Sequence, residues 1–168
     1  MKRPSGDETI AQLFDSHAPA LLLYARQWVG PVEADDVVQR VFVGLLAGGR
    51  QPAEPRPWLF RCVRNEAMAL HRSALRRDRR ERAVGSSAPR WFQSQPDDPI
   101  SSSEAQAALQ SLPLELREIV TLRLWGDLTL TEIATITGFA VSTVHARYTA
   151  AIESLRQTLE SPCKTPRT

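Results

Sequence analysis

Metal-binding and disulfide-forming residues are scarce in this sequence. Its 168 residues include two cysteines and three histidines, which form no C-x-x-C pair and follow no ligand spacing. These residues are Cys62, Cys163, His17, His71 and His145. We therefore expect no structural zinc site and no disulfide framework, and we interpret both cysteines as free thiols in a reducing compartment.

Long apolar segments are also lacking. No run of about 18 apolar residues is present, so no membrane insertion is expected. The N-terminal residues M-K-R-P-S-G-D-E are polar and lack the apolar part of an export signal, which predicts a cytoplasmic protein.

Patterns typical of β-strands, internal repeats and phosphate-binding glycine loops do not occur. The sequence therefore predicts an all-α protein, and no cofactor site is expected. The net charge of +2 does not by itself indicate whether the protein binds nucleic acid. The positions of the charged residues along the chain are more informative.

One acidic group could suggest a catalytic or metal site. Glu33, Asp35 and Asp36 are close in sequence, but no histidine or glycine-rich partner is near them. Acidic side chains are common in the first turn of a helix, where they complement the dipole. We therefore expect no enzyme, and a nuclease is the weakest of the functions considered.

The most informative stretch is Asp127–Leu159. Thr129 and Glu132 stand as T-x-x-E, which is a capping box at the start of a helix. Gly138 follows where that short helix must end. Apolar residues then recur at helical spacing from Val144, so the stretch predicts a helix-turn-helix whose second helix enters the major groove of DNA. An ordinary helical hairpin is the alternative.

A second helix carries most of the positive charge. Between Trp58 and Arg82, eight arginines accompany only three acidic residues. Such a face can be merely solvated, but this excess favours contact with phosphates. Pro57 is expected as the first residue of this helix, after a glycine- and proline-rich loop at Ala47–Pro57.

Two more helices are expected near the N-terminus. The first follows apolar positions from Thr9 to Trp28, with a kink or a division into two helices at Pro19. The second starts near Glu33 and has a broad apolar stripe that includes Val41, Phe42 and Leu46. Because the stripe is wider than a three-helix core needs, part of it, with Phe42, is expected to serve a protein partner.

Composition divides the chain into two small helical domains, residues 9–82 and 104–160. The residues between them, 83–103, are rich in Ser and Pro and are predicted to be a flexible linker, although Trp91 and Phe92 lie inside it. Residues 1–8 and the C-terminal tail are expected to be disordered.

Four stretches in this order resemble the extracytoplasmic-function (ECF) sigma factors of the sigma-70 family. They are D-D-V-V-Q-R-V-F at Asp35–Phe42, W-L-F-R-C-V-R-N at Trp58–Asn65, L-P-L-E-L-R-E-I-V-T-L-R at Leu112–Arg123, and the E-I-A…G…S-T-V array. The resemblance implies sigma region 2 at residues 9–82 and sigma region 4 at residues 104–160. It also implies a bacterial RNA polymerase initiation subunit without enzymatic activity.

The same resemblance implies roles for individual residues. The residues expected to bind core RNA polymerase, at the β′ clamp helices, are Asp36, Gln39 and Phe42. Those expected to contact the minus-ten promoter element are Trp58, Arg61, Arg64, Asn65, Arg72, Arg76 and Arg77. Those expected to contact the minus-thirty-five element are Ser142, Thr143, His145, Arg147 and Thr149. The implied partners are core RNA polymerase (β′ and β subunits), promoter DNA and an anti-sigma factor, which could hold the protein at the membrane.

A free-standing helix-turn-helix regulator is the alternative function. It would bind duplex DNA without polymerase and dimerise across two half-sites. That hypothesis leaves the first domain without a role.

Overall fold

The computed structural model describes residues 9–49, 51–81 and 103–160, and in these ranges the chain forms helices and no strand. The helices are α1 (Ile10–Ala25), α2 (Pro31–Ala47), α3 (Pro55–Glu81), α4 (Ser103–Ser111), α5 (Leu114–Leu124), α6 (Leu130–Thr137) and α7 (Val141–Glu160). The all-α prediction is therefore confirmed for this part of the chain. The expectations for residues 1–8, the linker with Trp91 and Phe92, and the tail lie outside the described residues.

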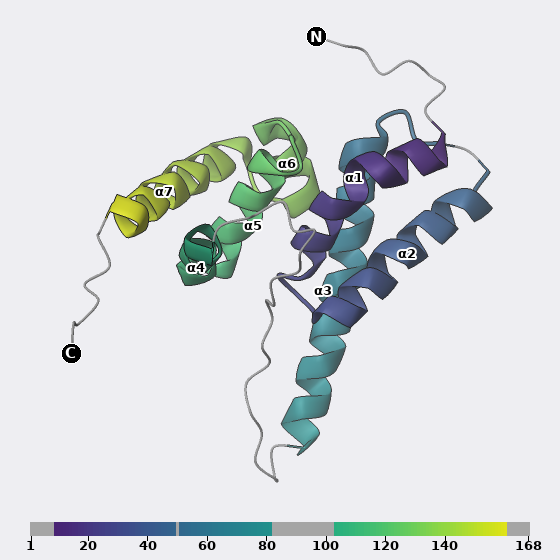
Figure 1. The fold of residues 1–168 in the computed structure, drawn as a ribbon, viewed down its shortest axis with the longest axis horizontal. Helices are drawn as coiled ribbons and strands as arrows, with labels where there is room; N and C mark the ends of the chain where they lie inside the picture. The colour runs from purple at the N-terminus through teal and green to yellow at the C-terminus, as the bar shows by residue number, and fades with distance from the viewer. Residues whose placement is uncertain (1–8, 50, 82–102, 161–168) are drawn as a thin grey trace. The chain divides into compact units, whose positions relative to one another are not determined.

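The helices form two compact units, α1–α3 and α4–α7 (Figure 1). In the first unit the three helices enclose one core, where the rings of Tyr24 and Phe60 meet edge to face with centroids 5.6 Å apart. The fully buried side chains of this core include Leu13, Leu21, Val37, Leu59 and Val63. Burial of these apolar side chains is the main term that stabilises the bundle.

Three prolines show how this residue type affects the helix boundaries. Pro19 lies inside the single helix α1, so of the two expectations, a kink or a division into two helices, the division is wrong. Pro31 and Pro55 open α2 and α3, two residues earlier than expected in each case. A proline in the first turn costs little, because the N–H that it lacks would have no partner within the helix.

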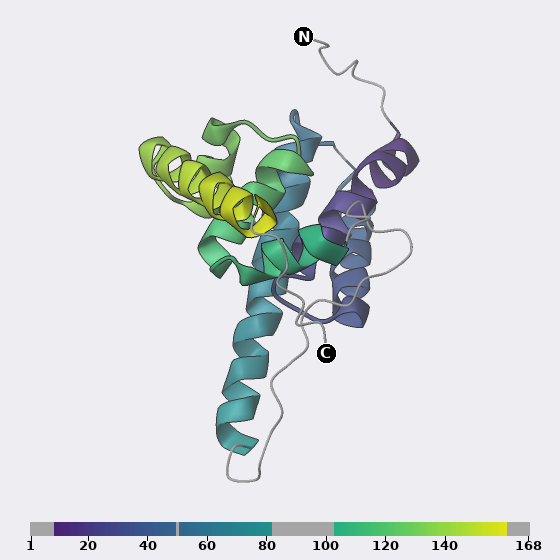
Figure 2. The same ribbon diagram turned by 60° about the vertical axis from the view of Figure 1, so that its left-hand side comes forward.

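Helix α3 is longer than the bundle that supports it. Its buried residues end at Ala67, and none of residues 68–80 is buried. Figures 1 and 2 both show this end of α3 running beyond α1 and α2. The C-terminal half of α3 therefore presents most of its surface to solvent or to a partner.

The second unit packs α4, α5 and α6 around α7. Its core includes Ile119, Leu122, Leu128, Ile133 and Val144, each of which is completely buried. Between α5 and α6, Nη1 of Arg123 donates a hydrogen bond of 2.8 Å to the carbonyl of Leu128. This bond holds the segment that leads into α6.

Candidate polymerase and nucleic-acid interfaces

The helix-turn-helix of the second unit begins with the capping box expected from the sequence. The amide of Glu132 donates to Oγ1 of Thr129 (3.2 Å), and the amide of Thr129 donates to Oε2 of Glu132 (2.7 Å). Gly138 ends α6 in the left-handed conformation, with φ of 79°, and its N–H donates to the carbonyl of Ala134. The α6–turn–α7 geometry is therefore the predicted one.

Three of the five residues expected to meet the minus-thirty-five element share one exposed face of α7. Ser142, His145 and Thr149 follow one another at intervals of three and four residues, which places them on one side of a helix. The Thr149 hydroxyl donates a hydrogen bond of 3.0 Å to the carbonyl of His145, which orients that side chain. We call Ser142, His145 and Thr149 the exposed face of α7.

The other two, Thr143 and Arg147, lie to the side of that face and are half-buried. The Arg147 guanidinium makes an ion pair with Glu115 of α5 (Nη2–Oε2 2.8 Å), and its central carbon lies 4.0 Å from the centroid of the Phe139 ring. Arg147 is thus engaged within the fold, which the sequence did not indicate.

Helix α3 carries a basic stripe along its exposed side. Arg61, Asn65, Arg72 and Arg76 are exposed and are separated by four, seven and four residues, so they line up on one face. Half-buried Trp58 lies at the start of this face. Arg79, which the sequence-based site omitted, is exposed three residues after Arg76 and extends the stripe. We call Arg61, Asn65, Arg72, Arg76 and Arg79 the α3 stripe.

Two arginines of the expected minus-ten set lie off the α3 stripe. Arg64 is half-buried, and its guanidinium carbon is 5.9 Å from the centroid of the Trp28 ring. The imidazole of His71 also meets Trp28, edge to face at 6.3 Å. Arg77 is exposed, but on a neighbouring side of α3. Helical spacing around Arg61 and Arg72 could have separated these two from the stripe.

Helix α2 exposes an unusual row of apolar side chains. Val32, Val43 and Leu46 are 72%, 62% and 60% exposed, and Asp36 and Gln39, also exposed, lie between Val32 and Val43 at the same helical spacing. We call Val32, Asp36, Gln39, Val43 and Leu46 the α2 stripe. Asp36, Gln39 and Leu46 were singled out in the sequence, whereas Val32 and Val43 were missed although the spacing of three and four residues predicts them.

Phe42 does not belong to the α2 stripe. Its side chain is only 5% exposed and packs against Phe14, with ring centroids 5.0 Å apart. Phe14 of α1 covers the ring, so Phe42 is a core residue of the first unit, while its expected contact with polymerase stays a prediction. Phe14 itself is 41% exposed and lies at the edge of this contact.

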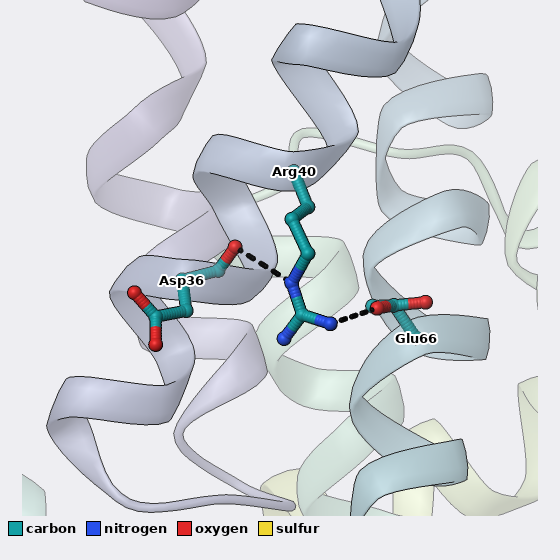
Figure 3. A network of polar contacts seen from close by, with 3 residues as sticks. All are labelled: Asp36, Arg40 and Glu66. Carbon is teal, nitrogen blue, oxygen red and sulfur yellow. Dashed lines mark hydrogen bonds and ion pairs between the residues drawn. The ribbon is translucent and has the colours of Figure 1, made fainter.

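Arg40 connects the helix of the α2 stripe to the helix of the α3 stripe (Figure 3). Its Nε donates to the backbone carbonyl of Asp36 (3.3 Å), and its Nη1 makes an ion pair of 2.7 Å with Glu66 of α3. Both side chains are substantially exposed, so this pair contributes modestly to stability and mainly fixes local geometry.

The described residues contain no group of three or more His, Cys, Asp or Glu side chains that could hold a metal ion. Burial raises the pKa of the half-buried Cys62 thiol, which keeps it protonated and weakly nucleophilic at neutral pH. Among the same residues, no helix has the length and apolar character needed to span a bilayer.

Comparisons with known proteins agree in both units. Residues 13–80 match the family described as Sigma-70 region 2, and residues 102–155 match the family described as Sigma-70, region 4. The chain is 35% identical over 145 residues to the ECF RNA polymerase sigma factor EcfG of Rhodopseudomonas palustris (strain TIE-1), covering 82% of this chain and 77% of that protein. It is 27% identical over 127 residues to the RNA polymerase sigma factor SigV of Bacillus subtilis (strain 168), covering 74% of each.

Solved structures share the fold. The sigma factor RpoE in complex with the anti-sigma factor NepR from Bartonella quintana aligns with a TM-score of 0.71 and 22% identity, over 90% of this chain and 97% of that one. CnrH in complex with the cytosolic domain of CnrY aligns with a TM-score of 0.59 and 26% identity, over 91% of this chain and 88% of that one.

Proposed function

Because this chain belongs to the ECF sigma factors of the sigma-70 family, we propose that it recruits core RNA polymerase to a promoter and helps to open the DNA there. Residues 9–82 bind polymerase and the minus-ten element, and residues 104–160 bind the minus-thirty-five element. The protein itself performs no catalysis and acts in the cytoplasm.

The observation that carries this proposal is the α2 stripe. Apolar side chains as exposed as Val32, Val43 and Leu46 cost free energy in water and are typical of a surface that a protein partner covers. Asp36 and Gln39 supply polar groups within the same surface, as protein interfaces commonly do. A regulator that binds DNA without polymerase could use this surface only to dimerise, whereas a polymerase subunit needs it to bind the enzyme. The partner is the β′ clamp helices.

The two DNA contacts fall on the other exposed faces. The α3 stripe offers guanidinium groups along a helix that stands clear of its own core, and Trp58 offers a ring for stacking, which are the means by which proteins hold a single strand. The exposed face of α7 offers Ser142, His145 and Thr149 to base edges in the major groove.

Control by an anti-sigma factor is part of the proposal. RpoE of Bartonella quintana is bound to the anti-sigma factor NepR, and CnrH is bound to the cytosolic domain of CnrY. A partner of this class would keep our protein from polymerase, and a membrane-anchored one would hold it at the membrane.

The α2 stripe can be tested by replacing Val43 and Leu46 with lysine. Both side chains are largely exposed, and lysine suits the C-terminal end of a helix, so the circular-dichroism spectrum should not change. We expect co-purification with core polymerase to weaken by about thirtyfold, as for loss of central interface residues. The control is Leu159→Lys, at an equally exposed apolar position near the end of α7, which should bind as wild type.

Two results would contradict the proposal. Normal polymerase binding by the Val43→Lys, Leu46→Lys protein would remove the role of the stripe. Failure of the wild-type protein to bind polymerase, together with tight binding to duplex DNA alone, would favour the free-standing regulator.

A further inference from the structure

Arg147 is the one arginine in the first half of α7, yet it does not lie on that helix's exposed face. Its side chain is 27% exposed, and it turns toward α5 and the α6–α7 turn. A permanent charge in a DNA-reading helix would ordinarily be assigned to a phosphate. The contacts of Arg147 indicate a different role.

Two contacts hold the guanidinium. Nη2 pairs with Oε2 of Glu115 at 2.8 Å, and the guanidinium carbon lies over the Phe139 ring, 4.0 Å from its centroid. Glu115 is in the first turn of α5, and Phe139 directly follows Gly138 in the turn. Arg147 of α7 therefore contacts both α5 and the turn between α6 and α7.

The second guanidinium nitrogen, Nη1, is buried and has no hydrogen-bond partner among the described residues. A buried donor without a partner costs free energy, so the ion pair with Glu115 and the contact with the Phe139 ring have to offset that cost. The ion pair and the ring contact together hold the side chain in one orientation, directed away from the exposed face of α7.

We propose that Arg147 is a positioning residue that sets the angle of α7, so that Ser142, His145 and Thr149 meet their bases, and that it makes no phosphate contact. Glu115 is its necessary partner. This inference rests on the proposed function, because it concerns how the same helix reads the minus-thirty-five element.

Removing the Glu115 charge separates this role from a phosphate contact, because the two roles predict opposite signs. An acidic side chain beside DNA repels phosphates, so Glu115→Gln should tighten binding if Arg147 simply meets the backbone. If Glu115 positions Arg147, the same change should loosen α7 and weaken specific binding. Glu115 is 62% exposed in its side chain, so the glutamine variant should fold normally.

The experiment uses holoenzyme formed from the full chain and core polymerase, with a duplex that carries its minus-thirty-five element and a scrambled duplex of equal length. Affinity for both is measured across a salt series for wild type, Glu115→Gln, Arg147→Met and the double variant. We expect each single variant to lose about three- to thirtyfold in specific affinity, with little change on the scrambled duplex. The double variant should lose no more than Arg147→Met alone, because both changes break one contact.

The salt dependence supplies a readout that is independent of affinity. Loss of one phosphate contact lowers the slope of log K against log salt by about 0.9, whereas loss of a positioning contact leaves it unchanged. The matched control is Arg156→Met, because Arg156 is on the same helix and its ion pair with Glu153 is a 3.6 Å contact between two exposed side chains. Specific affinity should be unchanged in that control.

The outcomes are distinguishable. A lower salt slope for Arg147→Met with equal or tighter binding by Glu115→Gln would overturn the inference and assign Arg147 to a phosphate. Unchanged specific affinity in both single variants would overturn it as well. If wild-type holoenzyme did not distinguish the two duplexes at all, the assignment of α7 as a reader of DNA would fail first.

Discussion

Single residues determine whether the helix-turn-helix can form, and Gly138 shows how. Its backbone is left-handed, with φ of 79°, a conformation that residues with a Cβ atom rarely adopt. A Cβ added to Gly138 would meet no atom within 4 Å. The requirement for glycine is therefore one of backbone conformation and not of space. Gly44, in the interior of α2, also has room for a Cβ but has ordinary helical geometry.

These two glycines predict opposite effects of the same substitution. Gly138→Ala should lower the free energy of unfolding by about 1–2 kcal/mol, the cost of the left-handed conformation for alanine. Gly44→Ala should raise it by about 0.5–1 kcal/mol, because alanine is the better helix former. Urea denaturation followed by circular dichroism measures both. Equal effects of the two substitutions would contradict the strained-turn explanation.

The residue scale is also where sequence reasoning reached its limit. Phe42 and Val43 are adjacent apolar residues of one helix, yet one is buried against Phe14 and the other is exposed. Only the position of α1 distinguishes them, and α1 is distant in sequence. Arg147 is similar, because nothing local indicates that Glu115, more than thirty residues earlier, captures its charge.

At the scale of elements, local signals were sufficient where a helix end is fixed by its own residues. The capping box of Thr129 and Glu132, with Gly138, predicted α6 and the turn, because each supplies hydrogen bonds within a few residues. At Pro19 the local penalty for a proline in a helix interior left a kinked helix and two separate helices both open, and packing of α1 against α2 and α3 favours one continuous helix.

The role of the α3 stripe can be tested by comparing arginines on the stripe with arginines beside it on the same helix. Its residues Arg72 and Arg76 point along the exposed face, whereas Arg77 and Arg80 are exposed on another side of the same turns. Replacing either pair by alanine removes the same net charge. The two double variants therefore separate a specific DNA track from general attraction to a polyanion.

We expect Arg72→Ala with Arg76→Ala to reduce open-complex formation and to lower the salt slope by about 0.7 for each lost contact with a single strand. Arg77→Ala with Arg80→Ala should have a much smaller effect. Permanganate reactivity of melted thymines measures opening on one promoter under equal polymerase occupancy. Equal losses in the two variants would mean that the stripe acts only through net charge.

At the scale of the whole molecule, one chain combines two helical units whose exposed surfaces differ. The first unit combines the apolar α2 stripe with the basic α3 stripe, and Arg40 and Glu66 tie their two helices together. The second unit presents the helix-turn-helix. A polymerase subunit that must hold both an enzyme and two promoter elements accounts for all of these surfaces, whereas a free DNA-binding regulator leaves the basic α3 stripe without a role.

Specific initiation in a reconstituted reaction tests this account most directly. Core polymerase with the purified full chain is incubated on fragmented genomic DNA of the source organism, and the 5′ ends of the transcripts are sequenced. We predict a set of discrete start sites, absent with core polymerase alone, that share sequence motifs near minus ten and minus thirty-five. The Val43→Lys, Leu46→Lys protein, at the same concentration, should start far fewer transcripts at these sites. Start sites identical to those of core polymerase alone, in the presence of well-folded wild-type protein, would contradict the account.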